Sequence, residues 1–300
     1  MLHEIAGTLF GRWYVTAFGV SFVVLAVRHL GVRKTLTYAS IAIVVGIAAE
    51  NGSVHWGFPY TRYGFVSSLR GKELFAFDVP LMVSLSYTFM SYFAFATARI
   101  IVAGPRSTRG RQPALEYVLA VVLAVWNLWM IDPISRLGEH FFLGRLFSYD
   151  GPGFWFGLPL GSQLGFALTS AVLIGVLTWL TRDEIPQPVK SLVSHPRLGA
   201  VGGFLGQLIF MAVTAFVVAR RAADPAVTQR ADALAGGTVI VFAPAMLLVA
   251  IHWGALATSP DAGADVRAPA IEPDRAASTG TGPTNGPNGS PRPLGEPVAR

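Results

Sequence analysis

The sequence contains no cysteine and few charged residues. Only 13% of its 300 residues are Asp, Glu, Lys or Arg, whereas charged residues make up about 25% of a typical soluble domain. The absence of cysteine excludes disulfide bonds, thiolate nucleophiles and cysteine-bound iron–sulfur clusters. Hydrophobic residues account for 52% of the chain. The composition therefore predicts an integral membrane protein and disfavours a soluble metalloprotein or a secreted disulfide scaffold.

The histidines, acids and lysines also lack the spacings of several membrane enzymes. The six histidines are scattered, without the His-x-x-x-His or His-x-x-His-His pairs of a di-iron site. No Asp-x-x-Asp or Asn-x-x-x-Asp repeat is present for a magnesium–diphosphate site. The last apolar run contains no lysine for a retinal Schiff base. The sequence predicts no metal and no cofactor.

Seven apolar runs predict seven transmembrane helices. Each run is uncharged and long enough, or nearly so, to cross about 30 Å of hydrocarbon. The runs are 13–27, 35–49, 79–98, 117–131, 151–181, 198–219 and 233–260. We expect an all-α, polytopic helix bundle over residues 1–258. A disordered tail rich in proline and glycine is expected over residues 259–300, which hold 8 of the 20 prolines and no aromatic residue.

The basic residues are best interpreted as markers of membrane orientation. The net charge is +6, but the arginines and lysines lie mainly in short gaps between apolar runs, which indicates topology rather than a nucleic-acid interface. The loops 28–34 and 104–113 are short and densely basic. We expect them and the tail on the cytoplasmic side of a bacterial inner membrane. The loop 220–232, on the opposite face, also carries three arginines.

Two acidic residues fall where the second and fourth helices are too short. Each of these runs has only 15 uncharged residues, which span about 22 Å at 1.5 Å per residue. Glu50 and Asp132 are therefore expected within or near the hydrocarbon on one membrane face, where ionisable groups are functional candidates. A carboxyl kept neutral there can donate a proton. The alternatives are an ion pair between Glu50 and Arg62 and a simple helix end at Asp132-Pro133.

The two loops on this face are rich in aromatic residues and glycine. An interfacial aromatic belt alone can explain the rings, but they can also line a pocket for a long apolar molecule. Glycines would let the backbone approach such a molecule, and Pro80 and Pro159 are expected near helix starts. Asp78 is expected either to cap a helix or to join the other two carboxyls. The remaining candidates are Trp56, Phe58, Tyr60, Tyr63, Tyr149, Trp155 and Phe156, with Gly52, Gly57, Gly64 and Gly157.

Taken in order, these motifs resemble a known family. They are similar in order and spacing to motifs of the CruF-type carotenoid biosynthesis membrane proteins. The chain departs from that pattern at Ser162 and at Gly165-Phe166, where the family has an asparagine and a Gly-Trp, and it lacks a tryptophan soon after Val79-Pro80. The matching segments are Glu50-Asn51-Gly52, Trp56-Gly57-Phe58-Pro59-Tyr60-Thr61-Arg62-Tyr63-Gly64, Asp78-Val79-Pro80, Asp132 and Phe156-Gly157-Leu158-Pro159.

The resemblance implies a carotenoid hydratase, which adds water across the terminal C=C bond of an acyclic carotenoid end group to give a tertiary alcohol. Our hypothesis is that Glu50 or Asp132 donates the proton and that the other carboxyl, with Asp78, orients the water. The expected partners are the lipid bilayer, the carotenoid and other membrane enzymes of the pathway. The alternatives are a non-catalytic carotenoid or lipid carrier and a small-solute transporter, which the lack of a convincing inverted repeat disfavours.

Overall fold

A computed structural model describes residues 1–103, 113–137, 145–149, 153–184 and 196–257. The segment Met1–Ala262 forms one compact unit. The expected tail over residues 259–300 lies outside the described residues, as do the loops 104–112 and 185–195.

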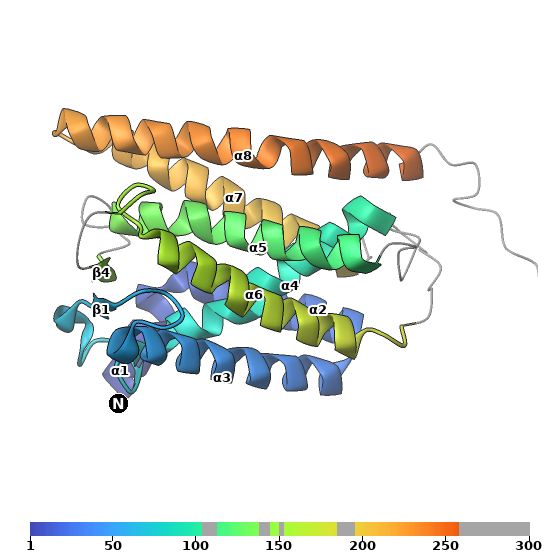
Figure 1. Ribbon diagram of the computed structural model, residues 1–300, viewed down its shortest axis with the longest axis horizontal. Coiled ribbons are helices and arrows are strands. Elements are labelled where there is room, and N and C mark those ends of the chain that lie inside the picture. The colour runs from blue at the N-terminus through green and yellow to red at the C-terminus, as the bar shows by residue number, and fades with distance from the viewer. Residues whose placement is uncertain (104–112, 138–144, 150–152, 185–195, 258–300) are drawn as a thin grey trace, which may run out of the picture. The chain divides into compact units, whose positions relative to one another are not determined.

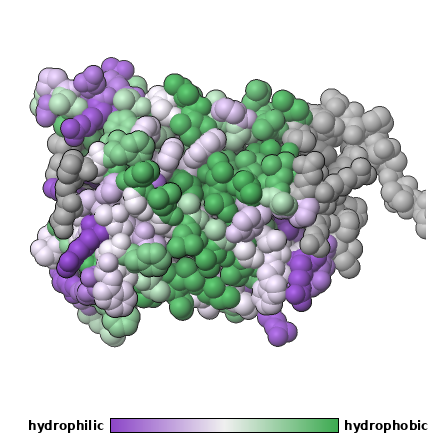
Figure 2. All heavy atoms as spheres, in the orientation of Figure 1, coloured by the Kyte–Doolittle hydropathy of each residue, from purple (hydrophilic) through white to green (hydrophobic). Residues whose placement is uncertain are grey.

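Seven long helices confirm the predicted all-α bundle, and each is long and apolar enough to cross a membrane. They lie roughly alongside one another (Figure 1). A short helix α1 (Leu2–Ala6) and a π-helix η1 (Gly7–Gly11) precede them. Figure 2 shows hydrophobic residues over the middle of one face and hydrophilic residues mostly toward its ends, as expected for a membrane-spanning bundle. The long helices are α2 (Trp13–Leu30), α3 (Val32–Trp56), α4 (Leu81–Ala103), α5 (Pro113–Arg136), α6 (Leu160–Leu180), α7 (Pro196–Arg221) and α8 (Pro225–Ala257).

Helix α4 forms the centre of the bundle. Every residue from Tyr87 to Ile101 is buried, and α4 contacts α2, α3, α5, α6, α7 and α8. The outer helices instead turn apolar side chains outward, such as Val44 and Ile240. Because lipid is as apolar as these side chains, their exposure carries no hydrophobic penalty in a membrane.

Four helix boundaries differ from the prediction. Helices α3 and α5 continue past Glu50 and Asp132, so both acids lie inside helices and Asp132 does not end one. Helix α6 begins at Leu160 rather than 151, after an extended Pro159. Helix α8 begins at Pro225 rather than 233, because the Asp224 carboxylate accepts a hydrogen bond from the Ala226 N–H and caps the first turn.

Short strands join the two aromatic loops at one end of the bundle. Strand β1 (Tyr63–Phe65) pairs antiparallel with β4 (Phe147–Tyr149), with Gly64 opposite Ser148. A 3-10 helix, η2 (Ser67–Leu69), follows β1. This pairing brings the loop after α3 against the loop after α5 and therefore gathers the ends of those helices.

Two tight turns precede α4 and α6 and share one backbone feature. Strands β2 (Phe75–Ala76) and β3 (Val79–Pro80) pair antiparallel. Residue Ala76 lies opposite Val79, just as Trp155 lies opposite Leu158. The residue after Ala76 and the residue after Trp155 both have a positive φ, 60° at Phe77 and 46° at Phe156. The similar sequences before Pro80 and Pro159 thus form similar turns.

A polar side chain from the preceding helix holds each of these turns. The Asn51 side chain donates to the Ala76 carbonyl at 3.3 Å and accepts from the Asp78 N–H at 3.1 Å. In the second turn, Arg136 Nη1 donates to the Gly157 carbonyl at 2.5 Å. Because Asn51 and Arg136 follow the two acids by one and four residues, these bonds tie each turn to the acid-bearing end of its helix.

Candidate functional site

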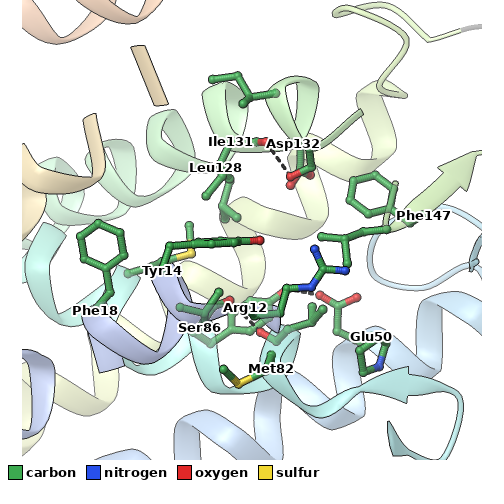
Figure 3. A pocket seen from close by; sticks show the side chains of 18 of the residues that line it. Arg12, Tyr14, Phe18, Glu50, Met82, Ser86, Leu128, Ile131, Asp132 and Phe147 are labelled. Carbon is green, nitrogen blue, oxygen red and sulfur yellow. Dashed lines mark hydrogen bonds between the residues drawn. The ribbon is translucent and has the colours of Figure 1, made fainter. Parts of the chain in front are cut away.

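The end of the bundle that carries the strands contains a partly enclosed cavity. Helices α2 to α7 and both aromatic loops contribute to its wall. One arginine and three carboxyl side chains line it: Arg12, Glu50, Glu73 and Asp132. Most of the remaining wall is apolar or aromatic and includes Tyr14, Phe18, Tyr63, Phe65, Phe89, Phe147, Tyr149, Phe166 and Phe210. Figure 3 shows Glu50 and Asp132 on opposite sides of this space, with Arg12 and Tyr14 drawn between them.

Glu50 is the first residue of a buried hydrogen-bond chain. Its side chain lies on α3, is 5% exposed, and has an oxygen 2.5 Å from the Tyr87 hydroxyl. Tyr87 lies 2.8 Å from the Tyr60 hydroxyl, which donates to Thr169 Oγ1 at 2.8 Å. Thr169 in turn donates to the Gly165 carbonyl at 3.1 Å. Among the described residues, no cation lies within ion-pairing distance of Glu50, so the alternative pair with Arg62 is not formed.

The number of hydroxyl protons determines which group donates in each bond of this hydrogen-bond chain. Each hydroxyl can donate one proton, and a carbonyl can donate none. Thr169 must therefore donate to Gly165, Tyr60 to Thr169, and Tyr87 to Tyr60. In this direction, the short contact between Tyr87 and Glu50 is a hydrogen bond only if a protonated Glu50 donates to Tyr87. If Glu50 is ionised, Tyr87 turns to donate to it, and the chain reverses at the cost of only the Thr169–Gly165 bond.

The loop tyrosines of the site retain their protons. Burial, followed by the proximity of Glu50, raises the pKa of Tyr60 well above its usual value. Burial, followed by the proximity of Asp132, also raises the pKa of Tyr149. The Tyr149 hydroxyl lies 2.7 Å from Ser162 Oγ, the position at which the family pattern has an asparagine. Both tyrosines are therefore available as neutral hydrogen-bond donors.

Asp132 supplies the second carboxyl of the cavity from α5. Its side chain is buried, with 8% exposure, because α5 continues past Pro133 to Arg136. None of the described residues forms a hydrogen bond or ion pair with this carboxyl. The oxygens of Asp132 are therefore available to a molecule inside the cavity.

An ion pair in the wall was not predicted from the sequence. Arg12 Nε donates to Glu73 Oε1 at 3.1 Å, and the two residues are only 4% and 7% exposed. Arg12 lies at the break between η1 and α2, with φ −115° and ψ 43°, and its carbonyl accepts hydrogen bonds from the Val15 and Thr16 N–H groups at the start of α2. The only signal in the sequence was a charged residue beside an apolar run and an acid in an aromatic loop, neither of which indicates a contact across 61 positions.

Part of the predicted set does not reach the cavity. Asp78 is paired with Arg70 and, at 3.0 Å, with His55, and its side chain is 38% exposed. The structure therefore separates Asp78 from Glu50 and Asp132. Within the described wall, the predicted residues that line the cavity are Glu50, Asp132, Tyr60, Tyr63, Tyr149 and Pro80.

Four predicted aromatic residues also lie away from the cavity wall. Trp56 and Phe58 are 84% and 66% exposed at the end of α3, as expected for an interfacial belt. Trp155 stacks on Trp129 with ring centroids 5.8 Å apart and donates its indole N–H to the Trp129 carbonyl. Phe156 packs edge-on against Trp155. These two rings stabilise the turn before α6 rather than line the described cavity.

The predicted glycines have different local roles. A Cβ at Gly52 would lie 2.6 Å from the Phe58 carbonyl oxygen, so only glycine permits this approach. Gly57 ends α3 in the left-handed conformation, with φ 72°. Gly157, with φ 85°, lies against the Arg136 guanidinium. At Gly64 a Cβ would meet no described atom within 4 Å.

Among the described residues, no group of three or more His, Asp or Glu side chains is placed to hold a metal ion. A family model with the description "Carotenoid biosynthesis protein" matches residues 10–228. The matched segment includes every residue that lines the cavity. No curated protein and no solved structure matches the chain.

Proposed function

The chain belongs to the carotenoid biosynthesis protein family, and from this premise we propose that it is a hydratase. The reaction adds water to the terminal carbon–carbon double bond of an acyclic carotenoid end group and gives a tertiary alcohol. One observation carries the proposal: the buried Glu50 carboxyl faces an aromatic cavity without a cationic partner and is bonded to a reversible hydroxyl chain.

Glu50 supplies the acid for the first step. Its proton passes to the less substituted carbon of the double bond, the π electrons form the new C–H bond, and the tertiary carbon becomes a cation. Tyr87 then donates to the new Glu50 carboxylate, and Tyr60 can donate to Tyr87. The chain thus offers a hydrogen bond to Glu50 in both of its protonation states, which lowers the cost of losing the proton.

The aromatic wall stabilises the cation until water arrives. Ring faces attract positive charge, and an apolar cavity limits access of bulk water to the reactive intermediate. The Asp132 oxygens, which have no partner among the described residues, hold and orient the single water that forms the C–O bond. Loss of one proton from that water completes the alcohol. The reaction is balanced with one alkene and one water and requires no redox change.

The test is expression of the chain in a lycopene-producing host, with mass analysis of the extracted pigments. A hydratase adds the mass of one water per reacted end group. A non-catalytic carotenoid or lipid carrier leaves the pigment mass unchanged, and this outcome would overturn the proposal. Other membrane enzymes of the pathway would supply the acyclic substrate, so the host must already make it.

Two conservative variants test the assignment of the acids. Glu50→Gln and Asp132→Asn keep the size of each side chain but remove its acid proton, so we expect the alcohol to fall to background in the first and strongly in the second. The matched controls are Glu4→Gln and Asp183→Asn, whose side chains are 34% and 80% exposed and lie outside the cavity wall. Undiminished alcohol in both cavity variants would refute the site.

A further inference from the structure

We infer that Glu73 is the base that takes the proton of the attacking water and that Arg12 keeps it ionised for this purpose. The inference rests on the proposed hydratase function and adds a residue that the family motifs do not include. It assigns separate roles to the three carboxyls of the cavity.

The geometry leaves one oxygen of Glu73 without a hydrogen-bond partner among the described residues. Oε1 accepts the hydrogen bond from Arg12 Nε at 3.1 Å, whereas Oε2 is buried and has no hydrogen-bond partner among the described residues. The Glu73 side chain is 8% exposed and belongs to the cavity wall. A buried carboxylate oxygen without a partner is costly, because nothing replaces the water that it loses on folding. A water admitted beside Oε2 by a small movement of the cavity wall would supply that partner.

Charge compensation separates Glu73 from the other two carboxyls. An anion in an apolar cavity is strongly disfavoured unless a cation accompanies it. Among the described residues, Glu73 has the Arg12 guanidinium beside it, while Glu50 and Asp132 have no ion-pair partner. Protonation of an alkene requires a neutral acid, and deprotonation of water requires an anionic base. Glu50 therefore suits the first task and Glu73 the second.

The same ion pair makes Arg12 compatible with a carbocation. An uncompensated guanidinium would repel the intermediate, but paired with Glu73 it contributes no net charge. When Glu50 gives up its proton, the new carboxylate balances the cation. The summed charge of Arg12, Glu50, Glu73 and the end group then stays at zero before and after protonation, which avoids a net charge in a low-dielectric site.

The base step is chemically balanced. A lone pair of the water oxygen forms the C–O bond to the tertiary carbon, one O–H bond of that water breaks, and its proton passes to Glu73 Oε2. The products are the tertiary alcohol and a neutral Glu73. Transfer of that proton back to the Glu50 carboxylate, through water in the cavity, restores the starting state.

The N-terminal segment fixes Glu73 in this position. Thr8 Oγ1 accepts a hydrogen bond from the Leu74 N–H at 2.7 Å. A Cβ at Gly7 would lie 1.9 Å from the Lys72 carbonyl oxygen, so η1 and residues 72–74 approach as closely as glycine allows. The π-helix thus holds Glu73 against the Arg12 side of the cavity.

The test separates protonation from water capture by use of D₂O. Membranes containing the full-length chain are given lycopene, and deuterium and alcohol are measured in the recovered pigment. The wild-type protein should form deuterated alcohol. In Glu73→Gln, Glu50 still protonates the alkene, but the cation returns a proton from a neighbouring carbon to Glu50. We expect at least about a tenfold loss of alcohol, equal to 1.4 kcal/mol, with deuterium accumulating in unhydrated lycopene.

Three comparisons make the outcome decisive. Glu50→Gln should show neither deuterium nor alcohol, whereas the control Glu4→Gln should match the wild type. Glu73→Asp keeps a carboxylate beside Arg12 but shortens it, so its ratio of deuterated lycopene to alcohol should lie between those of Glu73→Gln and the wild type.

The inference is overturned if Glu73→Gln forms alcohol at the wild-type rate, or if the folded variant incorporates no deuterium. If Glu73→Gln does not fold, a wild-type ratio in Glu73→Asp overturns it equally. Absence of alcohol from the wild-type protein would instead refute the hydratase function itself. The two failures are therefore distinguishable.

Discussion

The Tyr87 hydroxyl lies 2.5 Å from the Glu50 carboxyl and connects it to a second buried tyrosine. Tyr87 belongs to the central helix α4 and Glu50 to its neighbour α3, so the packing of these two helices sets the distance. A buried carboxyl without a cation beside it favours its protonated form, because burial disfavours the anion. In the proposed reaction, this carboxyl is the acid.

Replacement of Tyr87 by phenylalanine should slow alcohol formation by about 10- to 100-fold. The variant removes the bond to the Glu50 carboxylate, and a hydrogen bond to a charged group contributes about 1.5–3 kcal/mol. The measurement is the initial rate of alcohol formation in membranes. Tyr117→Phe is the matched control, since that hydroxyl donates to the Ala171 carbonyl away from the cavity wall. A wild-type rate in Tyr87→Phe would show that the hydrogen-bond chain does not contribute to the reaction.

Gly165→Ala should impair the same hydrogen-bond chain at the end opposite Glu50, where Thr169 donates to the Gly165 carbonyl. A Cβ there would lie 2.3 Å from the Pro59 carbonyl oxygen and 2.6 Å from the Tyr60 ring, so the loop that carries Tyr60 must move. We expect a loss of roughly 1–3 kcal/mol in stability, seen as a lower melting temperature, and a lower rate of alcohol formation. Gly175→Ala on the same helix is the control, because its nearest atom is 3.9 Å away. Equal behaviour of the two variants would contradict this packing.

The sequence was sufficient to predict the bundle and to single out two acids that line the cavity. Seven uncharged runs required seven spanning helices, and the two short runs required polar residues at membrane depth. Glu50 and Asp132 accordingly lie within α3 and α5. The prediction of the spanning helices succeeded because hydrophobic length is a local property of the chain and does not depend on the packing of distant segments.

The rest of the site depends on contacts between distant segments. Arg12 looked like one more basic residue flanking an apolar run, and only the folded chain places it against Glu73, 61 residues away. Trp56 and Tyr60 lie in one aromatic loop, yet the first is 84% exposed and the second is 1% exposed. Composition identified this loop as important, but the strand pairing and the end of α3 decide which rings face the cavity.

Gly7→Ala should disturb the position of Glu73 without touching the cavity itself. The added Cβ would lie 1.9 Å from the Lys72 carbonyl oxygen, which forces residues 72–74 away from η1. We expect a lower melting temperature and, in the D₂O experiment, a higher ratio of deuterated lycopene to alcohol. Gly11→Ala in the same π-helix meets no described atom within 4 Å and should leave that ratio unchanged. A wild-type ratio in Gly7→Ala would show that η1 does not position the base.

A second buried charge cluster lies at the other end of the bundle and joins α2, α4, α5, α7 and the segment after α6. Glu184, which follows α6, contacts Arg99 of α4 at 2.8 Å, Arg197 of α7 at 2.6 Å and His29 of α2 at 3.0 Å. Arg99 also donates to Thr181. The cluster lies away from the cavity wall, and we expect it to contribute to stability rather than to catalysis.

Acid should weaken this cluster in a defined pH range. Burial would raise the pKa of Glu184, but the hydrogen bond and charge of His29 and the charge of Arg197 lower it to about 2. Because the folded value lies below the usual 4.5, the stabilisation is complete above about pH 4.5 and is lost as the pH falls toward 2. The shift corresponds to roughly 3 kcal/mol. The melting temperature of the detergent-solubilised protein, followed by tryptophan fluorescence, should therefore fall as the pH is lowered from about 4.5 toward 2.

Glu184→Gln should remove the contribution of this cluster to the pH dependence of the melting temperature. The variant cannot ionise, so we expect a lower melting temperature than the wild type at about pH 6 and a smaller further loss at about pH 3. Asp183→Asn, the exposed neighbour, should retain the wild-type profile, because its 80% exposed side chain pairs only weakly. An equally steep profile in Glu184→Gln would assign the acid sensitivity to the carboxyls of the cavity instead.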